Sequence, residues 1–143
     1  MDYQKIRAAV EQPLLDAYNA LSPAVPVYFD NITAAPKNTT TEFVRINVTF
    51  GTTYEPTLTS SLDFARGAIV VRVFSEKGNG PLRSQTLVQT AVDVLETLNA
   101  TAKTKPGVFF RLDQISGPEF FADDEAPHFV ARIDAGYNAT VLS

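Results

Sequence analysis

The 143-residue chain contains no cysteine and no tryptophan, and only one histidine. Without cysteine, neither a disulfide framework nor thiolate chemistry is available to it. The single histidine, His128, excludes a zinc site built from several histidines of one chain. No apolar run approaches the length of a transmembrane helix, so we expect no membrane partner.

A secretory signal is also missing at the start of the sequence. Residues 1–15 contain no long apolar run and carry Asp2 and Glu11. We therefore expect a soluble protein that is made and folded in a cytoplasm. In that setting the five Asn-x-Thr triplets, which would mark glycosylated loops in a secreted protein, are chance products of a chain rich in Asn and Thr. The net charge of −4 disfavours a nucleic-acid groove or an anionic membrane as a partner.

The sequence is organised around Arg66–Ala102, where a strand leads through a turn into the most regular amphipathic helix of the chain. Residues 68–74 are apolar at both alternating sets of positions except at Arg72, so the pattern predicts a strand covered on both faces. The turn Gly78–Pro81 combines glycines with a proline suited to a first helical position. The helix predicted over Leu82–Asn99 has an apolar stripe formed by Leu87, Ala91, Val94, Leu95 and Leu98.

Periodicity elsewhere predicts a first helix and four more strands. The helix covers Asp2–Leu21, and Pro13 predicts a kink or a break near Glu11. The strands are predicted over Val25–Asp30, Glu42–Thr53, Val108–Ser116 and His128–Ala139. Pro26 marks the first of these as an edge strand or a strand start. The order α-β-β-β-α-β-β indicates a single α+β domain over residues 1–143, with two helices packed on a mostly antiparallel or mixed sheet.

Two connecting segments have the composition of an interaction surface. Tyr54–Ala65 is long for a hairpin connection, and long ordered loops are usually functional or mobile. Gly117–Pro127 is an acidic turn with two adjacent phenylalanines, which are either tucked into the core or exposed for a partner. Its carboxylates form either a solvated turn or a patch that meets basic residues on a neighbour. The candidate interface residues are Glu55, Leu58, Leu62, Asp63, Phe64, Phe120, Phe121, Asp123, Asp124 and Glu125.

Patterns that indicate catalysis or cofactor binding are weak throughout the chain. The Gly78–Gly80 turn lacks the Gly-Lys-Ser/Thr ending of a phosphate-binding loop, and Pro81 removes a backbone donor. Asp123–Glu125 lacks the spacing of a calcium loop. His128 starts a strand, and no serine in the chain has the context of a nucleophile elbow. We predict no catalytic, cofactor-binding or metal-binding residues, and therefore neither a cofactor nor an enzymatic reaction.

Arginines alternate with apolar residues on the predicted strands. They are Arg45, Arg66, Arg72, Arg111 and Arg132. A single strand arginine is normally solvated, but several on neighbouring strands build a charged sheet face that needs acidic partners. Asp113 and Asp134, which also lie on strands, are candidates for that role within the subunit or across an interface.

Three stretches of the sequence resemble the tail terminator proteins of long-tailed phages, of the lambda type. An N-terminal helix, MDYQKIRAAVEQPLLDAY, leads into the strand VPVYFDN at Val25–Asn31. The central segment GAIVVRVFSEKGNGPLRSQTLVQTAVDVL is similar to the strand, glycine-containing turn and helix of that family. Arg111–Tyr137 resembles its closing β-hairpin. The resemblance covers nearly the whole chain.

The resemblance implies a structural protein of the virion, assembled in the host cytoplasm. Such proteins form a ring, commonly hexameric, that caps the head-proximal end of the tail tube, stops its polymerisation and offers a joint to head-completion (neck) proteins. The implied partners are other copies of the chain, the tail tube protein and a neck protein, while DNA passes through the lumen without specific binding. Two alternatives remain open at this point: another head–tail connector or minor tail-tube protein, and a small ligand-binding domain that uses a pocket beside Gly78–Arg83.

Overall fold

A computed structural model describes residues 3–21, 25–29, 42–54, 62–76, 82–100, 108–122 and 128–142. Its elements in chain order are α1 (Tyr3–Asn19), β1 (Val27–Tyr28), β2 (Phe43–Tyr54), β3 (Leu62–Glu76), α2 (Leu82–Ala100), β4 (Val108–Ala122) and β5 (His128–Leu142). The predicted order α-β-β-β-α-β-β and the α+β class are therefore confirmed.

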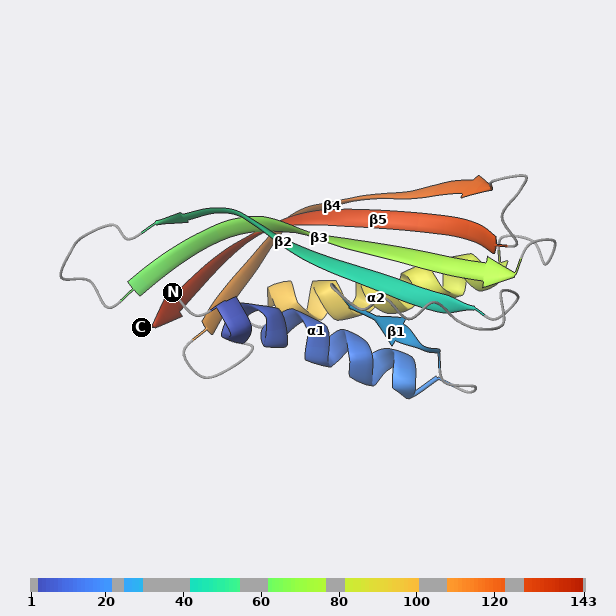
Figure 1. Ribbon diagram of the computed structural model, residues 1–143, viewed down its shortest axis with the longest axis horizontal. Coiled ribbons are helices and arrows are strands. Elements are labelled where there is room, and N and C mark those ends of the chain that lie inside the picture. The colour runs from blue at the N-terminus through green and yellow to red at the C-terminus, as the bar shows by residue number, and fades with distance from the viewer. Residues whose placement is uncertain are drawn as a thin grey trace.

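One five-stranded sheet, in the order β1-β2-β3-β5-β4, carries the fold. β1 pairs with β2 in parallel, and the other neighbours are antiparallel. The short β1 lies at an edge, as Pro26 predicts. Figure 1 shows α1 and α2 on the same side of the long, twisted sheet.

The core forms between the helices and the sheet side that faces them. Along the two central strands the core residues lie at odd-numbered positions of both β3 and β5, and Val130 is an exception at an even position. On the helices the buried stripe consists of Ile6, Ala9, Val10, Leu14 and Tyr18 in α1, and Leu87, Val88, Ala91, Leu95 and Leu98 in α2. The hydroxyl of Tyr18 donates to the carbonyl of Leu87 at 2.7 Å, and burial raises the pKa of this tyrosine well above its ordinary value. This bond ties the two helices together.

In the described part of the chain, β3 is covered on one face only, contrary to the prediction that both faces are covered. Ile69, Val71 and Val73 are buried under the helices, whereas Val70 and Phe74 are only half-buried on the opposite side. In the part of the chain that the structure describes, no element packs on that side (Figure 1). Apolar residues at nearly every position of a strand indicate that both of its faces are shielded from water. They do not indicate whether the shielding surface belongs to the same chain or to a partner.

The side of the sheet that faces away from the helices is called the open sheet face below. It comprises odd positions 43–49 of β2, even positions 64–74 of β3 and even positions 130–140 of β5, with the residues of β1 and β4 that pair beside them. Because both helices cover the other side (Figure 1), the described fold leaves the open sheet face available to a partner.

Several elements differ from the predictions in extent or continuity. Helix α1 continues through Pro13 without the break that is one of the two predicted outcomes, since its apolar face packs against α2 and outweighs one lost hydrogen bond. β3 begins at Leu62, so the connection predicted over Tyr54–Ala65 is shorter. β4 continues beyond Ser116 to Ala122 through a register shift, with a cis Gly117–Pro118 bond and a φ of 101° at Gly117. A bulge of this kind allows pairing to resume where the Gly-Pro pattern predicts a turn.

Candidate interaction surface

The predicted interface residues fall into two groups, one at each end of the sheet. Leu62, Asp63 and Phe64 begin β3, where Leu62 pairs with Leu142. Phe120 and Phe121 lie near the end of β4. The remaining predicted residues are outside the described residues: Glu55, Leu58, Asp123, Asp124 and Glu125.

The structure does not bring these two groups together. Along β3 the register with β5 runs from Leu62↔Leu142 at one end to Glu76↔His128 at the other. β3 has 15 residues, so its ends stand up to roughly 46 Å apart at about 3.3 Å per residue. In Figure 1 the start of β3 and the end of β4 lie at opposite ends of the long axis. The two groups are therefore separate candidate contacts.

Phe64 and Phe120 are strand residues rather than the loop residues that the sequence predicts. Phe64 is half-buried on the open sheet face, opposite Tyr54 and Thr140. The Phe120 side chain is 38% exposed, and its ring stacks on Phe129 with centroids 5.8 Å apart. The Phe120 ring is thus partly covered by Phe129, and the rest of it is exposed to a partner at one end of the sheet.

Strand pairing aligns five residues, one from each strand, in a row across the open sheet face, nearer the end of β3 than its start. The row is Tyr28, Arg45, Arg72, Arg132 and Glu119, in the order of the strands. We call its three central members the arginine row. The sequence indicates strand arginines that need acidic partners, but it does not predict that three of them stand directly side by side. Like charges in opposed positions destabilise a sheet unless something neutralises them.

The described part of the subunit neutralises the arginine row only partly. The Nη2 of Arg72 donates to the Oδ1 of Asn47 at 2.9 Å, and its Nε is buried without a hydrogen-bond partner. The guanidinium of Arg45 lies 5.8 Å from the ring centroid of Tyr28. Arg132 makes an ion pair with Asp134 at 3.5 Å, in which both side chains are nearly half exposed. One expected carboxylate therefore meets an arginine within the subunit.

Asp113 does not fill that role. Its carboxylate accepts a hydrogen bond of 3.4 Å from the side chain of Asn138. Among the described side chains, the open sheet face carries five arginines against three carboxylates, namely Arg45, Arg66, Arg72, Arg111 and Arg132 against Asp113, Glu119 and Asp134. This face is basic, although the whole chain has a net charge of −4.

Aromatic side chains border the arginine row on the same face. Phe43 and Phe74, on adjacent strands, stack with ring centroids 4.4 Å apart and an interplanar angle of 8°. The ring of Tyr28 packs edge-on against Phe43 at 5.7 Å. Arginine and aromatic side chains together are the composition that protein–protein interfaces favour.

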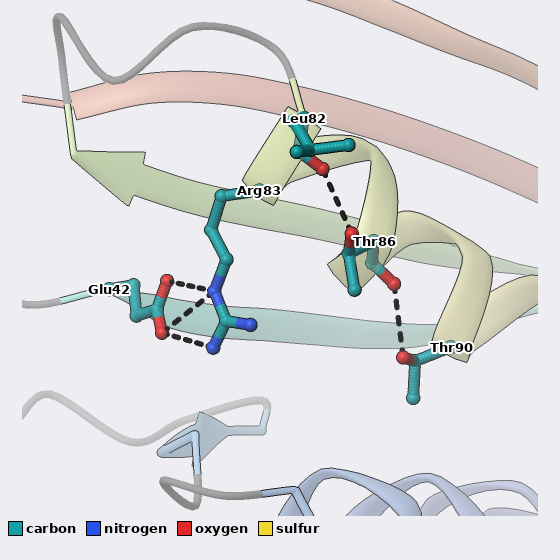
Figure 2. Close-up of polar contacts among 5 residues, drawn as sticks. All are labelled: Glu42, Leu82, Arg83, Thr86 and Thr90. Carbon is teal, nitrogen blue, oxygen red and sulfur yellow. Dashed lines mark hydrogen bonds and ion pairs between the residues drawn. The ribbon is translucent and has the colours of Figure 1, made fainter.

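The helix side of the molecule has the opposite character around α2. No Lys or Arg occurs in residues 84–98, and Asp93 and Glu96 are exposed. Arg83, at the start of the helix, forms a forked ion pair with Glu42, with its Nε 2.9 Å from one carboxylate oxygen (Figure 2). The hydrogen bonds to Glu42 raise the pKa of the Arg83 guanidinium. The alternative of a ligand pocket beside Gly78–Arg83 would need a free cation. Arg83 is the only cation among the described residues of that segment, and it is already paired with Glu42.

Other kinds of site find little support in the described residues. Within the described ranges, no group of three or more His, Asp or Glu side chains is placed to hold a metal ion. Nor is any helix of these ranges both long and apolar enough to cross a membrane. The side chain of His128 and the turn residues 77–81 lie outside what the structure describes.

Comparisons with known proteins identify one family and solved structures of similar fold. A family model described as "Phage tail terminator protein" matches residues 5–103. No curated protein matches the chain. A solved structure that carries an identifier in place of a functional name is similar with a TM-score of 0.68 and 27% identity, over 97% of this chain and 96% of that one. The family match extends from α1 through α2, and the structural match extends over both hairpins.

Proposed function

This chain belongs to the phage tail terminator protein family, and from that premise we propose that it forms a ring that caps the head-proximal end of the tail tube. In this proposal the ring ends tube polymerisation and offers a joint to head-completion proteins of the neck. Membership of the family by itself makes the chain a structural component of the phage tail and hence of the virion.

The observation that carries the ring proposal is the open sheet face. A sheet that packs helices on one side only leaves buried and half-buried aromatic and aliphatic residues and only partly neutralised arginines on the other. A repeated contact between identical copies covers such a face in every subunit, and a repeated rotation closes the set into a ring. The family commonly assembles as a hexamer, and we propose the same number here.

The two ends of the sheet receive different partners in this proposal. The β2–β3 end, with Glu55, Leu58 and Leu62–Phe64, contacts the tail tube protein. The β4–β5 end, with Phe120, Phe121 and Asp123–Glu125, contacts a neighbouring subunit or the neck protein. Their separation along β3 supports this division, because a ring between tube and neck must present two distinct surfaces.

The lumen and the site of assembly complete the proposal. A subunit with a net charge of −4 repels the phosphate backbone overall, so DNA passes through the ring without specific binding. Assembly takes place in the host cytoplasm and needs no cofactor. The ring performs no reaction, which agrees with the structural role of the family.

The deciding experiment mixes the purified chain with purified tail tubes and examines them by electron microscopy. We expect one ring at one end of each tube and no further elongation when free tube protein is added. Light scattering on the same samples gives the mass of the ring. Binding along the tube wall or at both ends contradicts the proposal and favours a minor tail-tube protein or another connector.

A further inference from the structure

We propose that the arginine row of one copy docks on the outer face of α2 in the next copy. The inference rests on the proposed ring and names the two surfaces that form its repeated contact. The outer face of α2 is defined here by Gln85, Thr86, Gln89, Thr90, Asp93 and Glu96.

The arginine row supplies hydrogen-bond donors that the described part of its own subunit does not use. Arginine carries five N–H donors and no acceptor. The described contacts of the row are one amide oxygen for Arg72, one distant carboxylate for Arg132 and one aromatic ring for Arg45. The buried Nε of Arg72 has no hydrogen-bond partner among the described residues. A partner surface with many hydrogen-bond acceptors and negative charge would pair with these unused donors.

The outer face of α2 has these properties. It contains a shallow hollow of about 400 Å3 lined by Gln85, Thr86, Gln89, Thr90 and Asp93. The hydroxyl of Thr86 donates to the carbonyl of Leu82 at 2.9 Å, and that of Thr90 donates to the carbonyl of Thr86 at 3.1 Å (Figure 2). Since these protons are used within the helix, the hydroxyl oxygens offer acceptor lone pairs to a partner.

Charge supports the same pairing. Asp93 and Glu96 are exposed one turn apart, and the nearest cation on the helix, Arg83, is already paired with Glu42. The Oδ1 of Asp93 accepts from the amide of Gln89 at 2.7 Å, which leaves its second oxygen for a guanidinium. A basic sheet face and an acidic helix face on one chain are complementary to each other in a second copy.

The composition of the sheet favours a protein over a nucleic acid as the partner of the arginine row. The five strands carry no lysine, and the arginine row is flanked by the stacked rings of Phe43 and Phe74. Arginine with buried aromatics marks the centre of protein interfaces, where lysine is depleted. The two surfaces also lie on opposite sides of the subunit (Figure 1). Their contact is therefore head-to-tail, the type that repeats around a ring.

Charge reversal tests the pairing with four variants. The first, Arg45→Glu/Arg132→Glu, reverses the two outer members of the row. The second, Asp93→Lys/Glu96→Lys, reverses the helix. The third combines all four substitutions. The control, Lys5→Glu, reverses an exposed charge on α1, outside both the open sheet face and the outer face of α2.

The measurement is the subunit concentration at which rings dissociate, from light scattering in the presence of tail tubes. We expect each double reversal to raise this concentration at least about tenfold, and the fourfold variant to return within about threefold of wild type. The control stays near wild type. Circular dichroism and thermal unfolding verify that each variant is folded. A folded variant reversed in the row that assembles normally overturns the inference, as does a fourfold variant that is not rescued.

Two further readouts separate this inference from its alternatives. If the wild-type chain forms no ring on tail tubes, the proposed function itself fails; if it forms rings that the row variant also forms, only the docking inference fails. Binding of a short DNA duplex is measured in parallel at physiological salt. Loss of DNA binding by the row variant with unchanged ring mass would assign the arginine row to nucleic acid and overturn the inference.

Discussion

Gly67 lies under the ring of Tyr137, so close that a β-carbon at Gly67 would stand 2.6 Å from the tyrosine hydroxyl oxygen. The same β-carbon would lie 1.9 Å from the carbonyl oxygen of Thr49. That carbonyl accepts a hydrogen bond of 2.8 Å from the Tyr137 hydroxyl, which reaches from β5 across β3 to β2. Because Gly67 has no side chain, the Tyr137 hydroxyl can pass over β3 and link β5 to β2 by a hydrogen bond.

Replacing Gly67 by alanine is therefore expected to destabilise the subunit by about 3 kcal/mol, because backbone must move to relieve the overlap. The matched control is Gly51→Ala. Gly51 is exposed, and its β-carbon would come no closer than 3.4 Å to the carbonyl of Arg66. That change is expected to stay within about 0.5 kcal/mol. Urea unfolding of both variants gives the comparison; equal stabilities would contradict the close-approach argument.

Tyr137 also predicts a loss of stability at high pH. Burial raises its pKa to about 12 from the ordinary value of 10.0, although the positive charge of Arg7 opposes the shift. Between these values the unfolded chain loses the proton while the folded chain retains it. The contribution of Tyr137 is thus fully present below pH 10 and is lost as the pH rises towards 12.

We expect the free energy of unfolding of the wild-type chain to fall over this pH range, and that of Tyr137→Phe to fall less steeply. The variant starts lower at neutral pH by about 1 kcal/mol, since it loses the bond to Thr49. Chemical denaturation at a series of pH values gives both curves. Parallel curves for the two proteins would show that Tyr137 does not contribute to the decline.

The forked pair between Glu42 and Arg83 joins the start of β2 to the start of α2. Both side chains are partly exposed, so we expect a coupling of about 1 kcal/mol in a double-mutant cycle with Glu42→Gln and Arg83→Met. The helical pair Arg7–Glu11 serves as the comparison, with about 0.4 kcal/mol expected. High salt should weaken both couplings. A Glu42–Arg83 coupling no larger than that of the helical pair would argue against a specific forked contact.

The β2–β3 end is expected to be needed for contact with the tube. Because Leu62 already pairs with Leu142, the deletion that spares the sheet removes residues 56–61. We expect this variant to unfold at nearly the wild-type temperature and to lose end-capping of tail tubes in electron micrographs. Leu58→Ser is a milder second variant with a partial loss. If the deletion variant caps tubes normally, the tube contact does not lie at this end of the sheet.

The acidic cluster at the other end is expected to meet basic residues of a neighbour or of the neck protein. Replacing Asp123 and Asp124 by Asn and Glu125 by Gln keeps the shape of the side chains and removes their charge. The expected result is ring assembly or neck joining that is weaker and less sensitive to salt. Asp16→Asn, an exposed carboxylate on α1, controls for a general charge effect. Unchanged assembly and joining would assign this cluster to a solvated turn.

The local pattern of the sequence is sufficient for the element order and the fold class. Alternation in residues 43–49 and helical spacing in Leu82–Asn99 are properties of neighbouring residues, so they can be recognised without knowledge of the partner strand. Where a strand ends depends instead on what pairs with it. β4 passes Gly117 and Pro118 because β5 continues to pair beside it beyond a bulge, and nothing within the turn-like stretch itself indicates this.

The same division holds for the candidate site. The sequence by itself determined that arginines occupy strands, that catalytic and metal-binding patterns are weak, and that two segments have interface composition. Only the tertiary structure decided that Arg45, Arg72 and Arg132 stand in one row, because their alignment is set by the register of strands far apart in the chain. It also decided that both helices cover one side, which leaves the row for a partner. Long-range pairing and helix packing carry this information, and neither is encoded in a local window of residues.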